Sequence, residues 1–468
     1  MNWFAIALVL LASSAFAAAG HSSETAERIN EDVRTVLQRT DTPGATILAI
    51  RDGHVIYRGA FGLRDFDRRL PARMDTYYEI GSITKQFTAA AILQLQNAGK
   101  LKIDDNVSVY LPDVPHADEV TLRQLLTHTS GMPDYFGLKS DEEFTKPTTF
   151  SQLMDLVADK PLDFQPGSRV SYSNTGYMIL GRIIEITSHE SYHEYRRKHL
   201  LKPAGMNETH IVPDEPSLAT MAKGYRRVNG KREQGLTIDD SYSWAAGDIV
   251  STANDVEKWN EALISGRIVP TSDYASMATP QRTTGGEDTG TGLGLFVDKR
   301  NGQPRIGHTG GSFGFTTANF YFPQQKLRVI ALTNNVDTPE PGELLSNVIF
   351  DDLYPELARA EMQPAPDEDA NVTSKAKSAF AALEQGTDDG TVFSTGLEAK
   401  MKGGLAQRME AQFGSYGAPT AFVFKGHEVV DSKSWFDYLI ECGPGSTLKF
   451  SVAMDAEAKV ASLGFNRF

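Results

Sequence analysis

The segment Ser82-Ile83-Thr84-Lys85 places a hydroxyl and an amine at a spacing that supports covalent catalysis. A serine hydroxyl is a weak nucleophile until a nearby base accepts its proton, and a lysine becomes such a base when burial lowers its pKa. Apolar residues recur at helical spacing from Ser82 to Ala98, and Gly99 predicts the end of that helix. Since positions three apart share a helix face, Ser82 and Lys85 are predicted to lie together at a helix start. The free N–H groups there favour the negative charge that develops during acyl transfer.

The same four-residue pattern occurs twice more, so its context has to decide between the copies. Ser374 to Lys377 lies in a charged stretch that follows a linker-like segment. Ser446 to Lys449 leads into a predicted strand, where positions three apart face opposite sides of the sheet. Of the three copies, the one at Ser82 opens a long amphipathic helix. We therefore take Ser82 as the candidate nucleophile and Lys85 as its activating partner.

A second candidate element is Tyr172-Ser173-Asn174, which follows a predicted turn at Pro166-Gly167. A phenol beside a lysine can carry protons between nucleophile and leaving group. The Asn174 amide can hold a substrate carbonyl and the lysine at once. Taken alone, the triplet is better explained as a Tyr and an Asn that cap a turn.

A third element, His308-Thr309-Gly310-Gly311, ends a predicted strand that begins near Pro304. A glycine at this position lets a substrate lie against the strand edge. The backbone N–H groups of Gly311 and Ser82 could together form an oxyanion hole. A histidine at a strand end can also be purely structural.

Together and in this order, these elements resemble the serine β-lactamase and penicillin-binding-protein superfamily, whose motifs include S-x-x-K and K-T-G. The resemblance covers most of Thr40 to Leu357. Leu125 to Gly131 (LLTHTSG) and Ala245 to Thr252 (AAGDIVST) resemble segments of its class C and esterase-like branch. It implies an α+β fold with an antiparallel sheet flanked by helices, a helical subdomain, and no cofactor or metal.

The resemblance also implies a role for each candidate residue. Ser82 is the nucleophile, Lys85 its activating partner and Tyr172 the general acid and base, and either Lys85 or Tyr172 takes the first proton. The substrate is bound by Asn174, His308, Thr309 and Gly310, and the oxyanion hole is formed by the N–H groups of Ser82 and Gly311. The sequence has His308 where the K-T-G motif has lysine. Because a histidine is only partly charged near neutral pH, a substrate carboxylate would be held less firmly.

The expected activity is therefore hydrolysis of a small peptide, amide or ester through an acyl-enzyme on Ser82. A D-amino acid peptide or a carboxylic ester is favoured over a β-lactam. One alternative is a penicillin-binding-like sensor that acylates but scarcely turns over. Another is a zinc peptidase, because His189, Glu190 and His193 match H-E-x-x-H. The preceding helix is expected to stop near Ile186, however, so the two histidines would not share a helix.

The remaining periodicity predicts the elements that position these residues. A helix is expected from Glu24 to Arg39, followed by a hairpin of Ala45 to Ile50 and Val55 to Phe61 around Asp52-Gly53. Leu101 to about Leu263 is mostly helical. Strands return at Gly294 to Val297, Pro304 to His308, Thr316 to Phe322 and Leu327 to Asn334, before a helix from Glu343 to Leu357. A hairpin, a helical insertion and further strands indicate an α+β fold.

The domain organisation follows from length and composition. The 468 residues exceed what one core usually organises. We predict a signal peptide at 1–19, a hydrolase domain at 24–358, an acidic, proline-containing linker at 359–372 and a small α+β domain at 373–468. The leader predicts export to the periplasm or the extracellular space, without a membrane span after cleavage. A net charge of −14 without a basic run argues against nucleic acid as a partner.

Overall fold

The computed structural model describes residues 23–337, 339–387, 390–414, 416–430 and 433–467. The predicted signal peptide lies outside these residues. The chain divides into two compact units, one of Asp41–Glu343 and one of Met1–Thr40 with Leu344–Phe468. We call them the larger and the smaller unit and describe each by itself.

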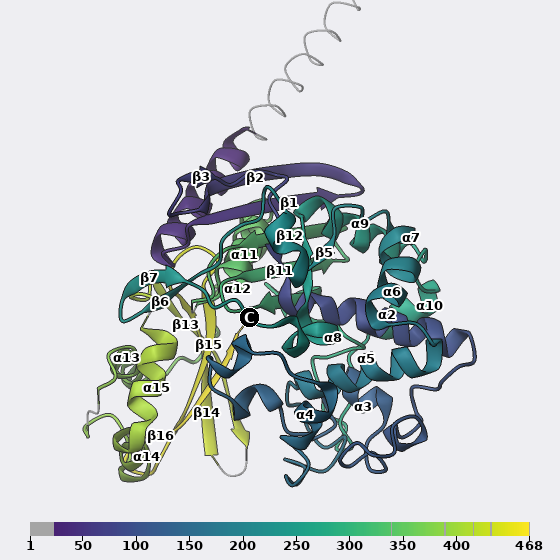
Figure 1. Ribbon diagram of the computed structural model, residues 1–468. Helices are drawn as coiled ribbons and strands as arrows, with labels where there is room; N and C mark the ends of the chain where they lie inside the picture. The colour runs from purple at the N-terminus through teal and green to yellow at the C-terminus, as the bar shows by residue number, and fades with distance from the viewer. Residues whose placement is uncertain (1–22, 338, 388–389, 415, 431–432, 468) are drawn as a thin grey trace, which may run out of the picture. The chain divides into compact units, whose positions relative to one another are not determined.

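The larger unit is built on a seven-stranded antiparallel sheet with the order β3-β2-β1-β12-β11-β10-β9. The first five of these strands are labelled in Figure 1. The first seven residues of β1 are buried, as expected for a central strand. Asp52 and Gly53 join β1 to β2 with φ of 50° and 79°, the left-handed pair that a tight hairpin turn requires. The strands are β1 (Gly44–Arg51), β2 (His54–Asp65), β3 (Leu70–Pro71), β9 (Phe296–Arg300), β10 (Gln303–Gly311), β11 (Thr316–Phe322) and β12 (Leu327–Thr333).

The helical part of this unit surrounds one buried helix, α2 (Thr84–Asn97), which packs against α5, α6 and α8 (Figure 1). Its other helices are α3 (Leu122–Leu126), α4 (Phe150–Asp155), α5 (Asn174–Ser188), α6 (Tyr192–Arg196), α7 (Lys202–Ala204), α8 (Trp244–Gly247), α9 (Ala253–Ile264) and α10 (Thr271–Met277). Short helical turns are η1 (Gly81–Ile83), η2 (Val107–Val109), η3 (Tyr135–Leu138), η4 (Glu143–Thr145), η5 (Arg197–Leu201), η6 (Val212–Ser217) and η7 (Asp240–Tyr242). Helix α9 packs on β1 and β12.

Local sequence signals account for most of these elements. The helix predicted from Ser82 to Ala98 is a 3-10 turn that continues into α2, and Gly99 follows it with φ of 69°. Two small sheets that the periodicity did not indicate lie wholly or partly in the segment predicted as helical. They are formed by β4 (Tyr78–Glu79), β5 (His210–Ile211) and β8 (Ile249–Ser251), and by β6 (Tyr225–Val228) and β7 (Lys231–Gln234).

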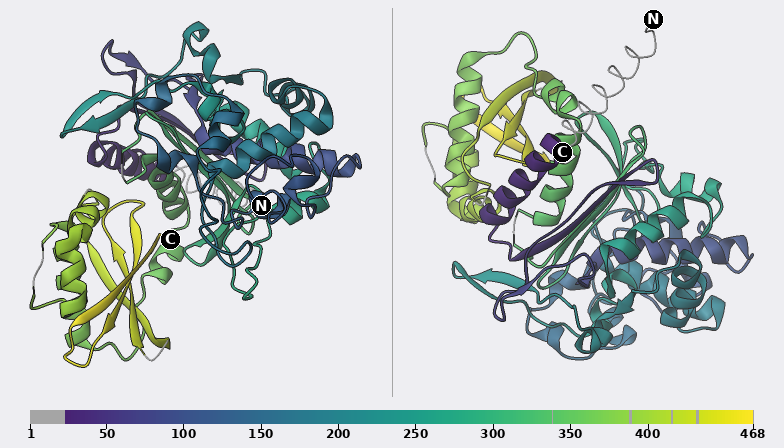
Figure 2. Two further views of the ribbon diagram at one scale, coloured as in Figure 1. Left: turned by 60° about the horizontal axis from the view of Figure 1, so that its bottom comes forward. Right: turned by 90° about the horizontal axis from the view of Figure 1, so that it is seen from above.

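The smaller unit contains a helix over residues 23–39, further helices and a four-stranded antiparallel sheet with the order β13-β14-β15-β16 (Figure 2). Phe380, Tyr438 and Phe450 lie in its core together with the single cysteine, Cys442. Its helices are α11 (Pro341–Leu353), which starts at the end of the larger unit, α12 (Pro355–Glu361), α13 (Ala370–Glu384), α14 (Thr395–Lys400), η8 (Met401–Leu405) and α15 (Ala406–Phe413). The strands are β13 (Ala421–Val430), β14 (Lys433–Glu441), β15 (Thr447–Met454) and β16 (Val460–Arg467).

The helix predicted from Glu343 to Leu357 is in fact two helices, α11 and α12. Pro355 has no N–H to donate and begins α12, so the first helix ends before it. Helix α12 then ends at Glu361 and α13 begins at Ala370. The domain boundaries inferred from the linker composition stay a prediction. The α+β class is confirmed. In the described part of the chain, we find no helix with the length and apolar character needed to cross a membrane.

Candidate active site

Ser82 and Lys85 lie side by side where η1 continues into α2. The Lys85 Nζ atom is 3.0 Å from Ser82 Oγ and donates to it. The same ammonium nitrogen donates to Asn174 Oδ1 at 2.9 Å and to the carbonyl oxygen of Ala246 at 3.0 Å. The three acceptors fix the position of the amine beside the hydroxyl.

Burial changes the charge of Lys85. The residue has no solvent exposure, and desolvation lowers its pKa to about 7, although the nearby carboxylate of Asp134 opposes the shift. At neutral pH, a large share of Lys85 is therefore the free amine, which can accept a proton. The local sequence places the two groups together, but it is the packing around α2 that lowers the pKa of the lysine to near neutral pH.

Tyr172 is brought to the same point from the segment before α5. Its hydroxyl is hydrogen-bonded to Ser82, and its ring centroid lies 4.8 Å from Lys85 Nζ. The ring also stacks on His128 with a centroid distance of 4.3 Å. Although 37% of the residue is exposed, removal of water from around the hydroxyl raises the pKa of Tyr172 well above its ordinary value. The phenol is therefore protonated at neutral pH.

The orientation of the Asn174 amide is set by Asp134. Asn174 Nδ2 donates to Asp134 Oδ2 at 3.0 Å, and the backbone N–H of Asn174 donates to Asp134 Oδ1 at 3.2 Å. With its nitrogen committed to the carboxylate, the amide presents Oδ1 to Lys85. Asp134 is a partner that the motif analysis missed, because it lies far from Asn174 in the sequence.

His308 has a different state from the one expected. It is 2% exposed, its ring stacks on Phe296 at 4.2 Å, and its Nδ1 lies against the carbonyl oxygen of Thr309. Burial, followed by the charge of Lys85, lowers the pKa of His308 to about 3. The expectation of a partial charge near neutral pH is therefore wrong. A carbonyl oxygen can only accept, so Nδ1 carries the proton of a neutral ring.

Glycines allow strand β10 to approach the turn that carries Ser82. A Cβ atom on Gly310 would lie 1.9 Å from the carbonyl oxygen of Ile80, and one on Gly81 would lie 2.6 Å from that of Gly311. Gly81 also has a φ of 52°, which favours glycine. At Gly311 an added Cβ would meet nothing. The strand edge at Gly311 is therefore open beside Ser82.

A cavity of about 350 Å³ opens at this point, and its lining includes Ser82, Asn174 and Gly311. Phe136 and Phe313 give it an apolar wall. His308 and Thr309 are not among the described residues that line it. The structure thus gathers Ser82, Lys85, Tyr172 and Asn174 around one hydroxyl, with the Gly311 strand edge beside it.

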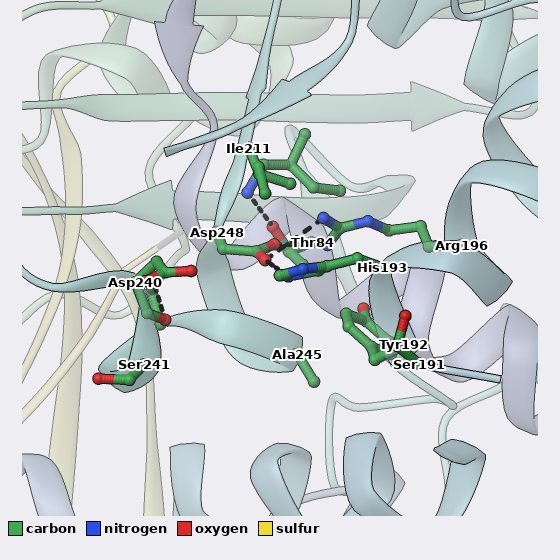
Figure 3. A network of polar contacts seen from close by, with 12 residues as sticks. Thr84, Ser191, Tyr192, His193, Arg196, Ile211, Asp240, Ser241, Ala245 and Asp248 are labelled. Carbon is green, nitrogen blue, oxygen red and sulfur yellow. Dashed lines mark hydrogen bonds and ion pairs between the residues drawn. The ribbon is translucent and has the colours of Figure 1, made fainter. Parts of the chain in front are cut away.

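The turn at α8, whose Ala246 carbonyl accepts from Lys85, is followed by a buried ion pair that the sequence did not reveal. Figure 3 shows this ion pair. Asp248, which directly follows α8, is fully buried and pairs with Arg196. His193 Nε2 lies 2.7 Å from Asp248 Oδ2. The carbonyl of Ala246, which accepts from Lys85, belongs to this anchored turn.

The H-E-x-x-H pattern is not arranged as a zinc site. His189 has a φ of 62° and caps the end of α5, whereas His193 belongs to α6 and faces Asp248 (Figure 3). Glu190 Oε1 is bound instead by Lys198 and His199, at 3.1 and 3.0 Å. The two histidines do not share a helix face, which is what this motif requires to hold a metal.

This fold, with these residues at its site, defines a hydrolase of the serine β-lactamase and penicillin-binding-protein superfamily. The chain belongs to the β-lactamase family, whose model, described as Beta-lactamase, matches residues 29–353.

Similar proteins include a putative penicillin-binding protein, PbpX, of Bacillus subtilis (strain 168). It is 29% identical over 334 residues, which cover 69% of this chain and 81% of that protein. Among solved structures, a D-stereospecific amidohydrolase from Streptomyces sp. has 27% identity and a TM-score of 0.58, over 66% of this chain and 94% of that one. The octameric penicillin-binding protein homologue from Pyrococcus abyssi has 24% identity and a TM-score of 0.63, over 94% of this chain and 98% of that one. The similarity to the Pyrococcus abyssi structure shows the fold alone.

Proposed function

We propose that the protein hydrolyses a small amide, peptide or ester through an acyl-enzyme on Ser82. The observation that carries this proposal is the 3.0 Å contact between Ser82 Oγ and a buried Lys85 whose pKa is lowered to about 7. A buried neutral amine beside a hydroxyl is suited to proton abstraction, because it loses little solvation when it accepts the proton.

Lys85 rather than Tyr172 takes the first proton. The raised pKa of Tyr172 makes a phenolate rare at neutral pH, whereas free Lys85 amine is abundant. Ser82 Oγ then bonds to the substrate carbonyl carbon, and the oxyanion receives hydrogen bonds from the N–H groups of Ser82 and Gly311. The Lys85 proton passes through the Tyr172 hydroxyl to the leaving group as its bond to carbon breaks.

Hydrolysis reverses these proton movements. Water gives a proton to the same base and adds to the ester carbon, the bond to Ser82 Oγ breaks, and Ser82 recovers its hydrogen. Asn174 orients the substrate carbonyl through the Nδ2 hydrogen that Asp134 does not accept. His308, which carries no charge, offers no cation to a substrate carboxylate. This favours carboxylic esters, amides and D-amino acid peptides whose own carboxylate is blocked or distant over β-lactams, which carry a carboxylate.

The test is intact-mass measurement after incubation with a penicillin, a fluorophosphonate and an activated ester. We expect an adduct on the wild type and none on Ser82→Ala. Ser374→Ala is the matched control, since Ser374 begins another S-x-x-K copy and is exposed. A wild type that no probe labels, or a Ser82→Ala protein that is still labelled, contradicts the proposal. Labelling without turnover would instead indicate a sensor.

The state of Lys85 predicts a pH profile. Since the free amine is required, kcat/KM for an ester should rise about tenfold per pH unit below pH 7 and level off above it. Lys85→Arg should remove this limb and lower the rate by roughly 10²–10⁴-fold, because the guanidinium stays protonated. A flat wild-type profile from about pH 5 to 8 would show that Lys85 is not the titrating base.

A further inference from the structure

Two glutamates that form no ion pair with a basic side chain of the described residues lie near the candidate nucleophile. Glu79 ends β4, three positions before Ser82, and lines the same cavity. Glu215 lies on η6 and lines an adjoining cavity of about 720 Å³, which Glu79 also lines. The two carboxyl groups interact directly. Glu79 is thus reached from the cavity at Ser82 and supported by Glu215.

In the described part of the chain, basic side chains do not balance the charge of this pair. Among the described residues, neither carboxyl forms an ion pair with a basic side chain, and Glu215 Oε1 is buried without a hydrogen-bond partner. Burial raises the pKa of both groups, and the charge of Glu79 raises that of Glu215 further, to about 9. At neutral pH Glu215 therefore retains its proton, and its hydrogen bond to Glu79 favours the ionised form of Glu79.

A partly buried carboxylate without a counter-ion favours a ligand that supplies one. The basic side chains that line the two cavities do not pair with these glutamates. Arg226 pairs with Asp141 at 2.8 Å and Lys223 with Asp67 at 2.6 Å. Arg64 and Arg68 line the adjoining cavity, and within the described residues neither forms an ion pair with Glu79 or Glu215. A cation that enters beside Ser82 therefore meets the carboxylate of Glu79.

We propose that Glu79, backed by Glu215, binds an ammonium group on the acyl part of the substrate. The preferred substrates are then amides, peptides or esters of amino acids whose amino group is free. This inference rests on the proposed function, because it places the ammonium beside a carbonyl attacked by Ser82. Glu79 acts here as a specificity-determining residue.

The experiment compares two p-nitrophenyl esters of equal size, of 2-aminobutyric and 2-methylbutyric acid, each as both enantiomers. Measurements at about pH 6.5 keep the amino group largely protonated. Because an α-ammonium activates the ester itself, each kcat/KM is divided by the rate of uncatalysed hydrolysis. We expect the wild type to favour the ammonium ester at least about tenfold for one enantiomer, as expected for a desolvated charge pair.

The variants assign that preference to the pair. Glu79→Gln should lower the ratio, and Glu79→Gln combined with Glu215→Gln should bring it to about one, because Glu215 could otherwise keep the charge. Asp240→Asn, which removes an acid that lines the adjoining cavity alone, should keep the wild-type ratio. A purely structural role of the pair would change both rates but leave their ratio.

The outcomes separate this inference from the proposed function. A wild-type ratio near one, or a ratio that the double variant keeps, overturns the ammonium subsite while Ser82 acylation stands. If neither ester is turned over and Ser82 forms no adduct, the proposed function fails. If the double variant does not fold, the ammonium subsite is tested on the wild type by inhibition. We expect n-butylammonium to inhibit hydrolysis of p-nitrophenyl 2-methylbutyrate, and n-butanol not to inhibit it. Equal inhibition by the two also overturns the subsite.

Discussion

Two acidic sites, the buried Asp248 and the partly buried pair of Glu79 and Glu215, differ in whether a basic side chain accompanies them. Burial acts to raise the pKa of Asp248, but the charge of Arg196 and the hydrogen bond with His193 outweigh it and lower the pKa. At Glu79 and Glu215 burial acts in the same direction, and no ion pair with a basic side chain of the described residues opposes it, so both pKa values are raised. The same desolvation is therefore accompanied by a lowered pKa at Asp248 and by raised pKa values at the two glutamates.

The difference separates a structural acid from one that is available to a ligand. Asp248 is satisfied within the fold and holds the turn that presents the Ala246 carbonyl to Lys85. The glutamate pair has no basic ion-pair partner among the described residues, and one of its members, Glu79, lines the cavity where a substrate would enter. A missing counter-ion beside an acid of this kind is therefore a stronger indication of ligand binding than a shifted pKa alone.

The largest effect that this comparison predicts is on folding. Asp248→Asn leaves the Arg196 guanidinium buried, 1% exposed and without its carboxylate. Removal of one partner of a buried ion pair costs about 3–5 kcal/mol. We expect urea denaturation to show that loss in the free energy of unfolding. A loss below about 1 kcal/mol would mean that Asp248 is not the anchor and that the comparison fails.

A smaller effect is expected at the third member of the same network. His193→Ala removes the hydrogen bond to Asp248 Oδ2, but Arg196 still pairs with the carboxylate. The His193 side chain is also 33% exposed, so water can replace it. The free energy of unfolding should fall by about 1 kcal/mol in the same urea experiment. A loss as large as that of Asp248→Asn would identify His193, not Arg196, as the main partner.

Local patterns in the sequence were enough to predict the residues around the serine. The helix that Ser82 opens, its spacing to Lys85, and the hairpin at Asp52-Gly53 depend on near neighbours, and the structure has each of them. Strands β11 and β12 match their predicted ranges within one residue. Periodicity is a local property, so these elements needed no tertiary information.

The remaining features depend on packing between distant segments. The Ala246 acceptor is a backbone carbonyl, which every residue type has, so no pattern could mark it. The neutral state of His308 follows from burial against Phe296, which a motif does not encode. Glu79 and Glu215 lie far apart in the chain and meet only after β4 and η6 are placed.

The smallest predicted effect is a change in how stability depends on pH. Glu215 has a folded pKa of about 9, whereas an unfolded glutamate has one of about 4.3. Between these values the folded state holds a proton that the unfolded state has released, so the free energy of unfolding should fall as pH rises. Glu215→Gln cannot titrate and should lessen this fall, as urea denaturation at about pH 5.5, 7 and 8.5 would measure. Glu233→Gln, an exposed glutamate on β7, should leave it unchanged.

The sign of this slope is what distinguishes the two acidic sites. The lowered pKa of Asp248 stabilises the fold above the unfolded pKa of an aspartate, and that contribution is lost only as pH falls. The glutamate pair acts in the opposite direction, because its carboxyls are disfavoured as anions. If Glu215→Gln steepens the fall, the carboxylate of Glu215 is stabilised by the fold. It would then be a structural acid like Asp248, and the case for an ammonium subsite would lose its physical basis.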